Sequence, residues 1–146
     1  MRFFLDTSIC IDILRTAGPD SSVELFKTFE EVNSGCISVI TVAELFAGVY
    51  LSKQKDAGEK TEEILSFLEI IDLNARIAQK GGRIYAHLSG LGRKIEFNDC
   101  LIAATAIQAG FQSIVTRNGD HFTRVEGLSV IVPEDITNWR GSAGWE

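Results

Sequence analysis

Four acidic residues stand where an active site could form. Asp6 directly follows a short apolar segment, residues 2–5, and Asp120 comes soon after a second one, residues 113–115. Glu44 and Asp99 lie near the starts of two helices expected from apolar residues at helical spacing. Carboxylates gathered in one place repel one another unless a cation neutralises them, and oxygen ligands favour a hard cation such as Mg²⁺ or Mn²⁺. Such a cluster could hydrolyse a phosphodiester with a metal-activated water.

Each acid also has a purely structural interpretation. Glu44 stands three residues after Thr41, so the two could form a capping box at the start of a helix. Asp99 could be a first-turn acid that complements a helix dipole, and Asp120 could belong to an Asn-Gly-Asp turn. Asp6 is the hardest to explain in this way, because an acid that ends a buried strand contributes little to stability.

The elements that must position these acids alternate between strands and helices. Strands are expected over 2–5, 36–40, 113–115 and 128–132, with an extended segment at 70–73. Helices are expected from Thr7 or Ser8 to Leu14, from Ser21 or Ser22 to Val32, from Thr41 to Val49, over 64–68, from Asn74 to Leu91 with a weak point at Gly81-Gly82, and from Asn98 to Ala109. This order predicts a mostly parallel sheet with helices on both faces.

In such a sheet, ligands collect at the carboxyl ends of the strands. Asp6 ends one strand, and Asn118 and Asp120 follow another, so these residues should lie along one edge. The helix starts that carry Glu44 and Asp99 should face the same edge. The topology therefore predicts that the four acids converge.

The charge of the chain restricts how it could bind nucleic acid. Its 146 residues include 14 basic and 20 acidic ones, a formal net charge of −6, which argues against a protein that coats nucleic acid by positive surface alone. Residues 74–95, however, contain no acid, and Arg76, Lys80 and Arg83 form one basic helical stripe there. That stripe, with Arg117, could hold phosphates beside the acids, although an ordinary solvated face has the same pattern.

Other classes of protein are less compatible with this composition. No apolar stretch is long enough to span a membrane, and no signal peptide is evident, so a cytoplasmic protein is expected. Three widely spaced cysteines argue against a disulfide scaffold or a zinc site and favour core positions: Cys10, Cys36 and Cys100.

Four segments, taken together, resemble PIN-domain ribonucleases, and most closely the VapC-type toxins of toxin–antitoxin pairs. The segments are 4–8 (Phe-Leu-Asp-Thr-Ser) with 11–14, then 38–49, 98–106 and 114–122, in the family's order. The resemblance implies a three-layer α/β/α sandwich and one PIN-like nuclease domain over 1–140, and the tail over 141–146, small and polar apart from Trp145, is expected to fray. The resemblance also implies a Mg²⁺- or Mn²⁺-dependent endoribonuclease that cuts single-stranded or looped RNA, such as transfer or ribosomal RNA.

The resemblance also assigns roles to individual residues. Asp6 and Asp99 match metal ligands, Glu44 matches a further catalytic acid, and Asp120 is expected to be the fourth. The family places this fourth acid at more than one spacing, and His121 stands at the other position, directly before Phe122, so either residue could complete the site. Four polar residues match supporting positions: Thr7, Ser8, Thr116 and Asn118.

The expected partners follow from the resemblance as well. They are an RNA substrate, a VapB-type antitoxin and a second copy of the chain in a homodimer. The absence of an acid directly before Phe122 keeps a different function open, namely a catalytically weak or silent PIN-like module that binds RNA or protein.

Overall fold

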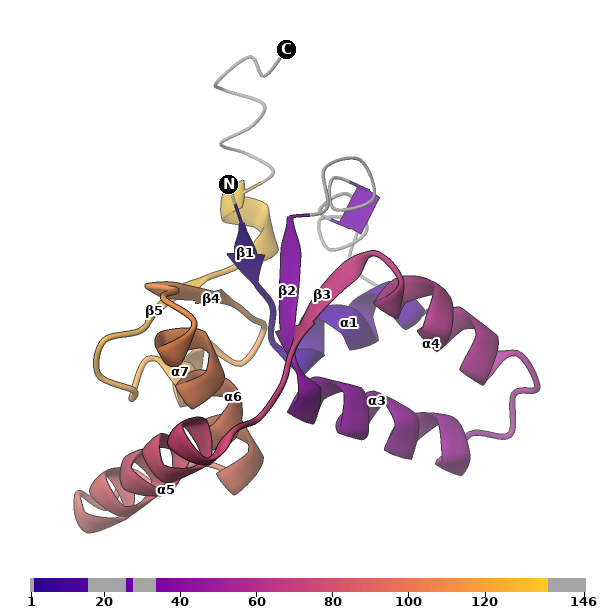
Figure 1. Ribbon diagram of the computed structural model, residues 1–146. Helices are drawn as coiled ribbons and strands as arrows, with labels where there is room; N and C mark the ends of the chain where they lie inside the picture. The colour runs from indigo at the N-terminus through magenta and orange to yellow at the C-terminus, as the bar shows by residue number, and fades with distance from the viewer. Residues whose placement is uncertain (1, 16–25, 28–33, 137–146) are drawn as a thin grey trace.

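The structure, a computed structural model, describes residues 2–15, 26–27 and 34–136 (Figure 1). The elements are β1 (Phe3–Phe4), α1 (Thr7–Leu14), β2 (Gly35–Ser38), α3 (Val39–Leu51), α4 (Ala57–Leu65), β3 (Leu68–Ile71), α5 (Ala75–Gly90), α6 (Phe97–Gln108), β4 (Ser113–Val115), α7 (Gly119–Phe122) and β5 (Ser129–Ile131). Most of the helix expected up to Val32, and the tail expected at 141–146, lie outside the described residues and stay predictions.

The strands form a parallel sheet in the order β3-β2-β1-β4-β5. β1 pairs with β2, β2 with β3, and β4 with β5, all in parallel. A parallel bridge between Leu5 and Val115 joins β1 to β4. The chain adds strands on one side of β1 and then crosses to its other side, so the strand order changes direction between β1 and β4. In open α/β sheets this switch point is where ligands bind.

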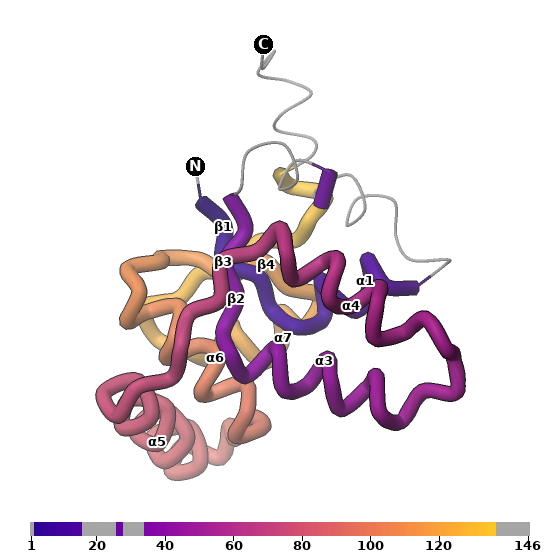
Figure 2. Tube along the Cα trace, turned by 45° about the vertical axis from the view of Figure 1, so that its right-hand side comes forward, coloured from indigo at the N-terminus to yellow at the C-terminus, as the bar shows by residue number. Residues whose placement is uncertain are grey.

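Helices cover both faces of the sheet. Successive strand residues point to opposite faces, so Phe3 and Leu5 join one core with Ile9 of α1, Leu45 of α3 and others, whereas Phe4 joins a second core. That second core contains Leu88 of α5 and a run of buried residues from α6. Figures 1 and 2 both show α3 and α4 on one side of the strands and α5 on the other. The predicted three-layer α/β/α sandwich is confirmed.

Three helix starts differ from the predictions. The N-cap of α1 is Asp6 rather than Thr7 or Ser8, and α6 begins at Phe97, one residue before the expected cap Asn98. α3 begins directly after β2, with Ser38 Oγ accepting a hydrogen bond of 3.0 Å from the amide of Ile40. The prediction of Thr41 as its cap is therefore wrong.

The segment between α3 and β3 also differs. The helix expected over 64–68 is displaced to α4, Ala57–Leu65, inside the charged stretch, and the extended segment begins earlier, as β3 at Leu68. α4 buries only Thr61 and Ile64. Because only two positions of α4 are buried, its sequence has too weak an apolar pattern to predict where the helix lies.

α5 matches its prediction closely. The Oδ1 of Asn74 caps it by accepting a 2.9 Å hydrogen bond from the amide of Ile77. Gly81, expected to weaken the helix, instead lies against α6, where a Cβ would come within 2.6 Å of Leu101 Cδ2. This glycine lets two helices pack closely and does not interrupt the first.

Two expectations from composition can be compared with the structure. Cys10, Cys36 and Cys100 are free and buried, as expected for core residues. No helix in the described part of the chain is both long and apolar enough to cross a membrane.

Candidate active site

Asp6 lies at the switch point of the sheet and is almost completely buried, with 2% of its surface exposed. Its amide donates a 2.9 Å hydrogen bond to the carbonyl of Val115, which holds the end of β1 against the end of β4. Its Oδ2 accepts two 2.8 Å hydrogen bonds, from the hydroxyls of Ser8 and Thr116. Residues more than one hundred positions apart in sequence therefore orient this carboxylate.

Glu44 belongs to a hydrogen-bonded group between α1 and α3. Its Oε1 accepts a 3.0 Å hydrogen bond from the hydroxyl of Thr7, which lies 2.9 Å from the hydroxyl of the fully buried Thr41. Glu44 therefore does not form the capping box with Thr41 that the sequence left open. Thr41 is a supporting residue that sequence reasoning missed, because its spacing to Glu44 suggested a helix cap.

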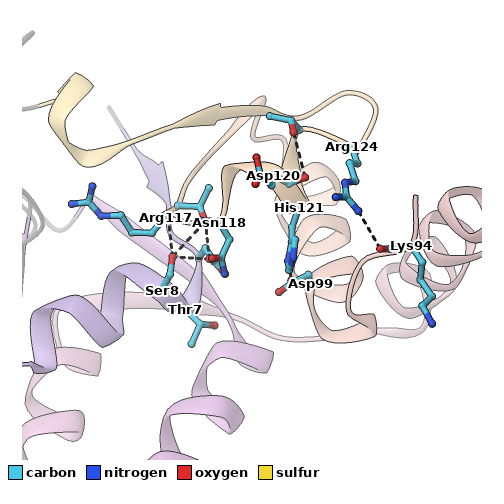
Figure 3. Close-up of polar contacts among 12 residues, drawn as sticks. Thr7, Ser8, Lys94, Asp99, Arg117, Asn118, Asp120, His121 and Arg124 are labelled. Carbon is cyan, nitrogen blue, oxygen red and sulfur yellow. Dashed lines mark hydrogen bonds and ion pairs between the residues drawn. The ribbon is translucent and has the colours of Figure 1, made fainter. Parts of the chain in front are cut away.

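Asp99, in the first turn of α6, contacts His121 on α7 (Figure 3). Its Oδ2 lies 2.7 Å from His121 Nδ1. The Asp99 side chain is 13% exposed and that of His121 is 38% exposed. Asp120 and His121 were the two residues that could complete the site, and of these it is His121 that contacts Asp99.

The three acids influence one another electrostatically. Burial raises the pKa of the Glu44 carboxyl, and the negative charges of Asp99 and Asp6 raise it further, against the hydrogen bond from Thr7. Burial likewise raises the pKa of Asp99, as does the charge of Asp6, while the hydrogen bond from His121 lowers it. The predicted convergence of Asp6, Glu44 and Asp99 is therefore seen in the structure.

The donors in this cluster suit a hard divalent cation. Among the hydrogen bonds of the described residues, Asp6 and Asp99 each use Oδ2 and Glu44 uses Oε1, so each acid keeps a second oxygen outside these bonds. Among the described residues, no group of three or more His, Cys, Asp or Glu side chains is arranged so that together they could hold a metal ion. Mg²⁺ does not require such a group, since it retains several waters and is commonly held by one or two carboxylates.

Asp120 and Asn118 lie at the rim of this cluster. The side chain of Asp120 is exposed, and its charge is not among those that raise the pKa of Glu44 or Asp99. The backbone amide of Asn118 donates a 2.8 Å hydrogen bond to the hydroxyl of Thr116 and so supports the partner of Asp6. The structure thus brings together three of the four predicted acids and leaves Asp120 facing solvent on the neighbouring turn.

Arg117 is part of an ion-pair network within the protein. Its Nε donates to Asp12 at 3.0 Å, and its Nη1 contacts both carboxylate oxygens of Glu134 at 2.7 Å. This arrangement ties the end of β4 to α1 and favours a structural role over the expected phosphate contact. The signal in the sequence was Asp12 itself, because a charge inside the apolar run 11–14 indicates a buried partner.

The basic stripe on α5 is partly assembled into one surface. Lys80 and Arg83 line a hollow of about 340 Å³ together with His87, Arg124 and the acidic Glu126. Arg76 is exposed one turn earlier on the same helix and does not line this hollow. Two of the three predicted stripe residues therefore share this hollow with one further basic residue from another segment, Arg124, and with one acid, Glu126.

The raised carboxyl pKa values predict how stability depends on pH without metal. The ordinary values for Glu44 and Asp99 are 4.5 and 3.8, and both are raised on folding, so the folded state binds more protons above these values. The contribution of each acid to the free energy of unfolding therefore falls as pH rises from its ordinary pKa through the raised one. Glu44→Gln should make this loss smaller.

Denaturant unfolding in EDTA, from about pH 4 to 7, measures this effect. Glu62→Gln, an exposed change on α4, is the matched control and should behave as the parent protein does. Identical pH profiles for Glu44→Gln and the parent would show that folding does not raise the pKa of the Glu44 carboxyl.

Comparison with known proteins identifies the family. A family model described as "PIN domain" matches residues 3–128. The protein named "Ribonuclease VapC2" from Rickettsia felis is 37% identical over 129 residues, which cover 88% of this chain and 95% of that protein. The chain therefore belongs to the PIN-domain family, and the resemblance to its VapC-type members is confirmed.

One further relative and one solved structure support this placement. "tRNA(fMet)-specific endonuclease VapC" from Shigella flexneri is 35% identical over 131 residues, covering 88% of this chain and 95% of that protein. A crystal structure titled as VapBC2 from Rickettsia felis bound to a promoter DNA fragment matches with a TM-score of 0.78 and 34% identity, covering 90% of this chain and 98% of that one.

Proposed function

We propose that this protein is a divalent-metal-dependent endoribonuclease and the toxin of a VapBC-like pair. The observation that carries the proposal is the buried Asp6 at the switch point, whose charge raises the pKa of both Glu44 and Asp99. Within the described part of the chain, neither Asp6 nor Glu44 forms an ion pair with a basic side chain. A cluster of this kind is stabilised by a bound cation. The identity to VapC ribonucleases supports the same function.

Asp6 and Asp99 are the proposed ligands of Mg²⁺ or Mn²⁺. When bound, such an ion activates a water and offsets the charge that develops on the phosphate oxygens. Ser8 and Thr116 fix the direction of the Asp6 carboxylate, and Asn118 fixes Thr116 through its backbone amide. The ring nitrogen Nδ1 of His121, 2.7 Å from Asp99 Oδ2, fixes the direction of the Asp99 carboxylate. The chain thereby holds both carboxylates in place before substrate binds.

Glu44 is the proposed proton acceptor. Thr7 holds its Oε1, which leaves Oε2 to take a proton from the attacking water. The raised pKa of the Glu44 carboxyl suits this role, because a base works best when its pKa approaches the operating pH. Asp120, exposed beside His121, stays a proposed fourth acid at the edge of the site.

The proposed substrate is single-stranded or looped RNA, such as transfer or ribosomal RNA. Lys80 and Arg83, which share a hollow with His87, Arg124 and Glu126, are proposed to contact phosphates at a distance from the acidic cluster, with Arg76 extending the stripe. Local basic patches of this kind explain how a chain with a net charge of −6 could hold RNA. A relative named as specific for tRNA(fMet) supports the choice of transfer RNA.

The proposed protein partners are a VapB-type antitoxin and a second copy of the chain, in the cytoplasm. A groove of about 210 Å³ between α1, α3 and α4 is lined by apolar side chains such as Leu14 and Val49 and extends to Glu44. An antitoxin helix in this groove could direct a basic side chain to the acidic cluster. The matching VapBC crystal structure supports a VapB partner.

A cleavage assay separates this function from that of a silent PIN-like binding module. The purified chain is incubated with Mg²⁺ and an end-labelled hairpin RNA, in parallel with a perfect duplex. The proposal predicts cuts inside the hairpin loop and an intact duplex. Binding to the hairpin without turnover would instead support the silent module.

Metal binding can be measured without activity. We expect Mg²⁺ at a hundred times its dissociation constant to stabilise the folded protein by about 2.7 kcal/mol, because the ion binds only the folded site. Asp99→Asn should lose most of this gain in thermal unfolding experiments. Equal stabilisation of both proteins by Mg²⁺ would place the ion elsewhere.

A further inference from the structure

A hollow of about 280 Å³ adjoins the active site and shares one wall with it. That wall is His121, which lines the hollow and also contacts Asp99. In Figure 3, His121 stands between Ser8 on one side and Lys94 on the other. The hollow is lined by Tyr85, Lys94, Ile95, Glu96, Phe97 and His121.

Phe97 gives this hollow an exposed aromatic face. It is 48% exposed, although it is a large apolar side chain, and it lies at the first position of α6, two residues before Asp99. Tyr85 packs edge-on against it, with ring centroids 5.3 Å apart and an interplanar angle of 74°. Tyr85 therefore supports the Phe97 ring on one side, while the rest of the ring stays open to solvent. Aromatic rings of this kind stack with nucleobases of any sequence.

Lys94 places a positive charge at the same hollow. The loop that carries it is fixed by Arg124, whose Nη1 donates to the carbonyls of Lys94 and Arg93 at 3.2 and 3.4 Å (Figure 3). Among the described residues, no carboxylate forms an ion pair with the Lys94 ammonium. Lys94 is therefore available to a phosphate, in a hollow where Phe97 offers a ring.

The size and charge of the hollow restrict what it can hold. Pockets that enclose a whole small-molecule ligand are usually about 300–1,000 Å³, so a hollow of about 280 Å³ is of a size for one nucleotide base. Glu96 also lines it, and this carboxylate would repel a run of phosphates but could accept hydrogen bonds from the amino groups of a base. A nucleotide whose one phosphate lies at Lys94 satisfies both conditions.

We propose that this hollow is the subsite for one unpaired RNA nucleotide next to the scissile phosphate. Its base stacks on Phe97, and Lys94 contacts its phosphate. The inference rests on the proposed endoribonuclease function, because the hollow is placed next to the scissile phosphate only if Asp99 is part of the active site. It explains why single-stranded or looped RNA would be preferred, since a paired base cannot leave its helix to stack on Phe97 without losing its partner.

The base contact is tested in the Asp6→Asn protein, which should bind RNA without cutting it. The probe is a short single-stranded RNA in which 2-aminopurine replaces each base in turn. We expect fluorescence quenching at one position, and Phe97→Ala should remove it and weaken binding about 5- to 150-fold. Phe97→Trp should preserve both. The matched control is Tyr50→Ala. Like Phe97, Tyr50 is an exposed aromatic residue that packs against a neighbouring ring, here Phe46, but it lies on α3.

The phosphate contact has a separate readout. Lys94→Gln should reduce the steepness of the fall of log affinity with log salt by about 0.7, the value for one phosphate contact on a single strand. Melting temperatures check that each variant is folded. If the unsubstituted chain cuts RNA, but Phe97→Ala leaves RNA affinity and 2-aminopurine quenching in the Asp6→Asn protein unchanged, the proposed subsite is wrong and the proposed nuclease function is retained. If the unsubstituted chain neither cuts nor binds RNA, both proposals are overturned.

Discussion

Asp6→Asn should reduce RNA cleavage by more than about 100-fold while the protein stays folded. Loss of an outer partner of a metal ligand already costs about 10- to 100-fold, and Asp6 is proposed to be a ligand itself. The Asn side chain keeps one carbonyl oxygen, which can accept the hydrogen bonds that Ser8 and Thr116 donate. It also removes a charge that raises the pKa of Glu44 and Asp99. The melting temperature without metal should therefore be unchanged or higher.

The assay compares initial cleavage rates at saturating Mg²⁺ with melting temperatures in EDTA. Asp56→Asn is a suitable control, because Asp56 is an exposed acid at the N-cap of α4, in a different part of the fold. Full activity of Asp6→Asn would remove Asp6 from the site. A variant that is inactive and unfolded would instead indicate that the carboxylate is needed for structure.

Arg117→Ala should destabilise the fold by about 2 kcal/mol. The substitution removes the guanidinium that donates to Asp12, a carboxylate with 7% exposure, and to both oxygens of Glu134. Hydrogen bonds to charged groups are worth about 1.5–3 kcal/mol, so loss of this guanidinium should cost about 2 kcal/mol. Denaturant unfolding of the two proteins measures the difference.

The same variant distinguishes the structural role of Arg117 from the phosphate contact expected from sequence. If the role is structural, the salt dependence of RNA binding should be unchanged under conditions where the variant is folded. Arg117→Lys retains the charge but not the planar fork, and should recover only part of the stability. If Arg117→Ala has normal stability but its RNA affinity depends less steeply on salt, Arg117 contacts a phosphate as the sequence predicted.

The sequence predicted the parallel sheet and the three acids because both depend on local patterns. Short apolar runs fixed the strands, and the order of elements fixed their direction, so the site could be placed at the carboxyl ends. Asn74 as a helix cap was predictable for the same reason, since a cap acts on amides two or three residues away.

What the sequence did not predict depends on contacts between distant segments. Thr41 contacts Thr7 of α1 and does not cap its own helix. Arg117 donates a hydrogen bond to Asp12, which lies 105 positions earlier in the sequence. The choice between Asp120 and His121 is of the same kind, because neighbours on one turn point in different directions. The structure turns His121 to Asp99 and leaves Asp120 exposed.

Metal dependence is tested by removal and return of the metal in one cleavage experiment. The purified chain is treated with EDTA, incubated with a hairpin RNA, and then supplied with excess Mg²⁺ or Mn²⁺, while cut products are followed with time. Cleavage should stop in EDTA and resume with either ion. Cleavage that continues undiminished in EDTA would contradict the account, because the acids around Asp6 would then work without a cation.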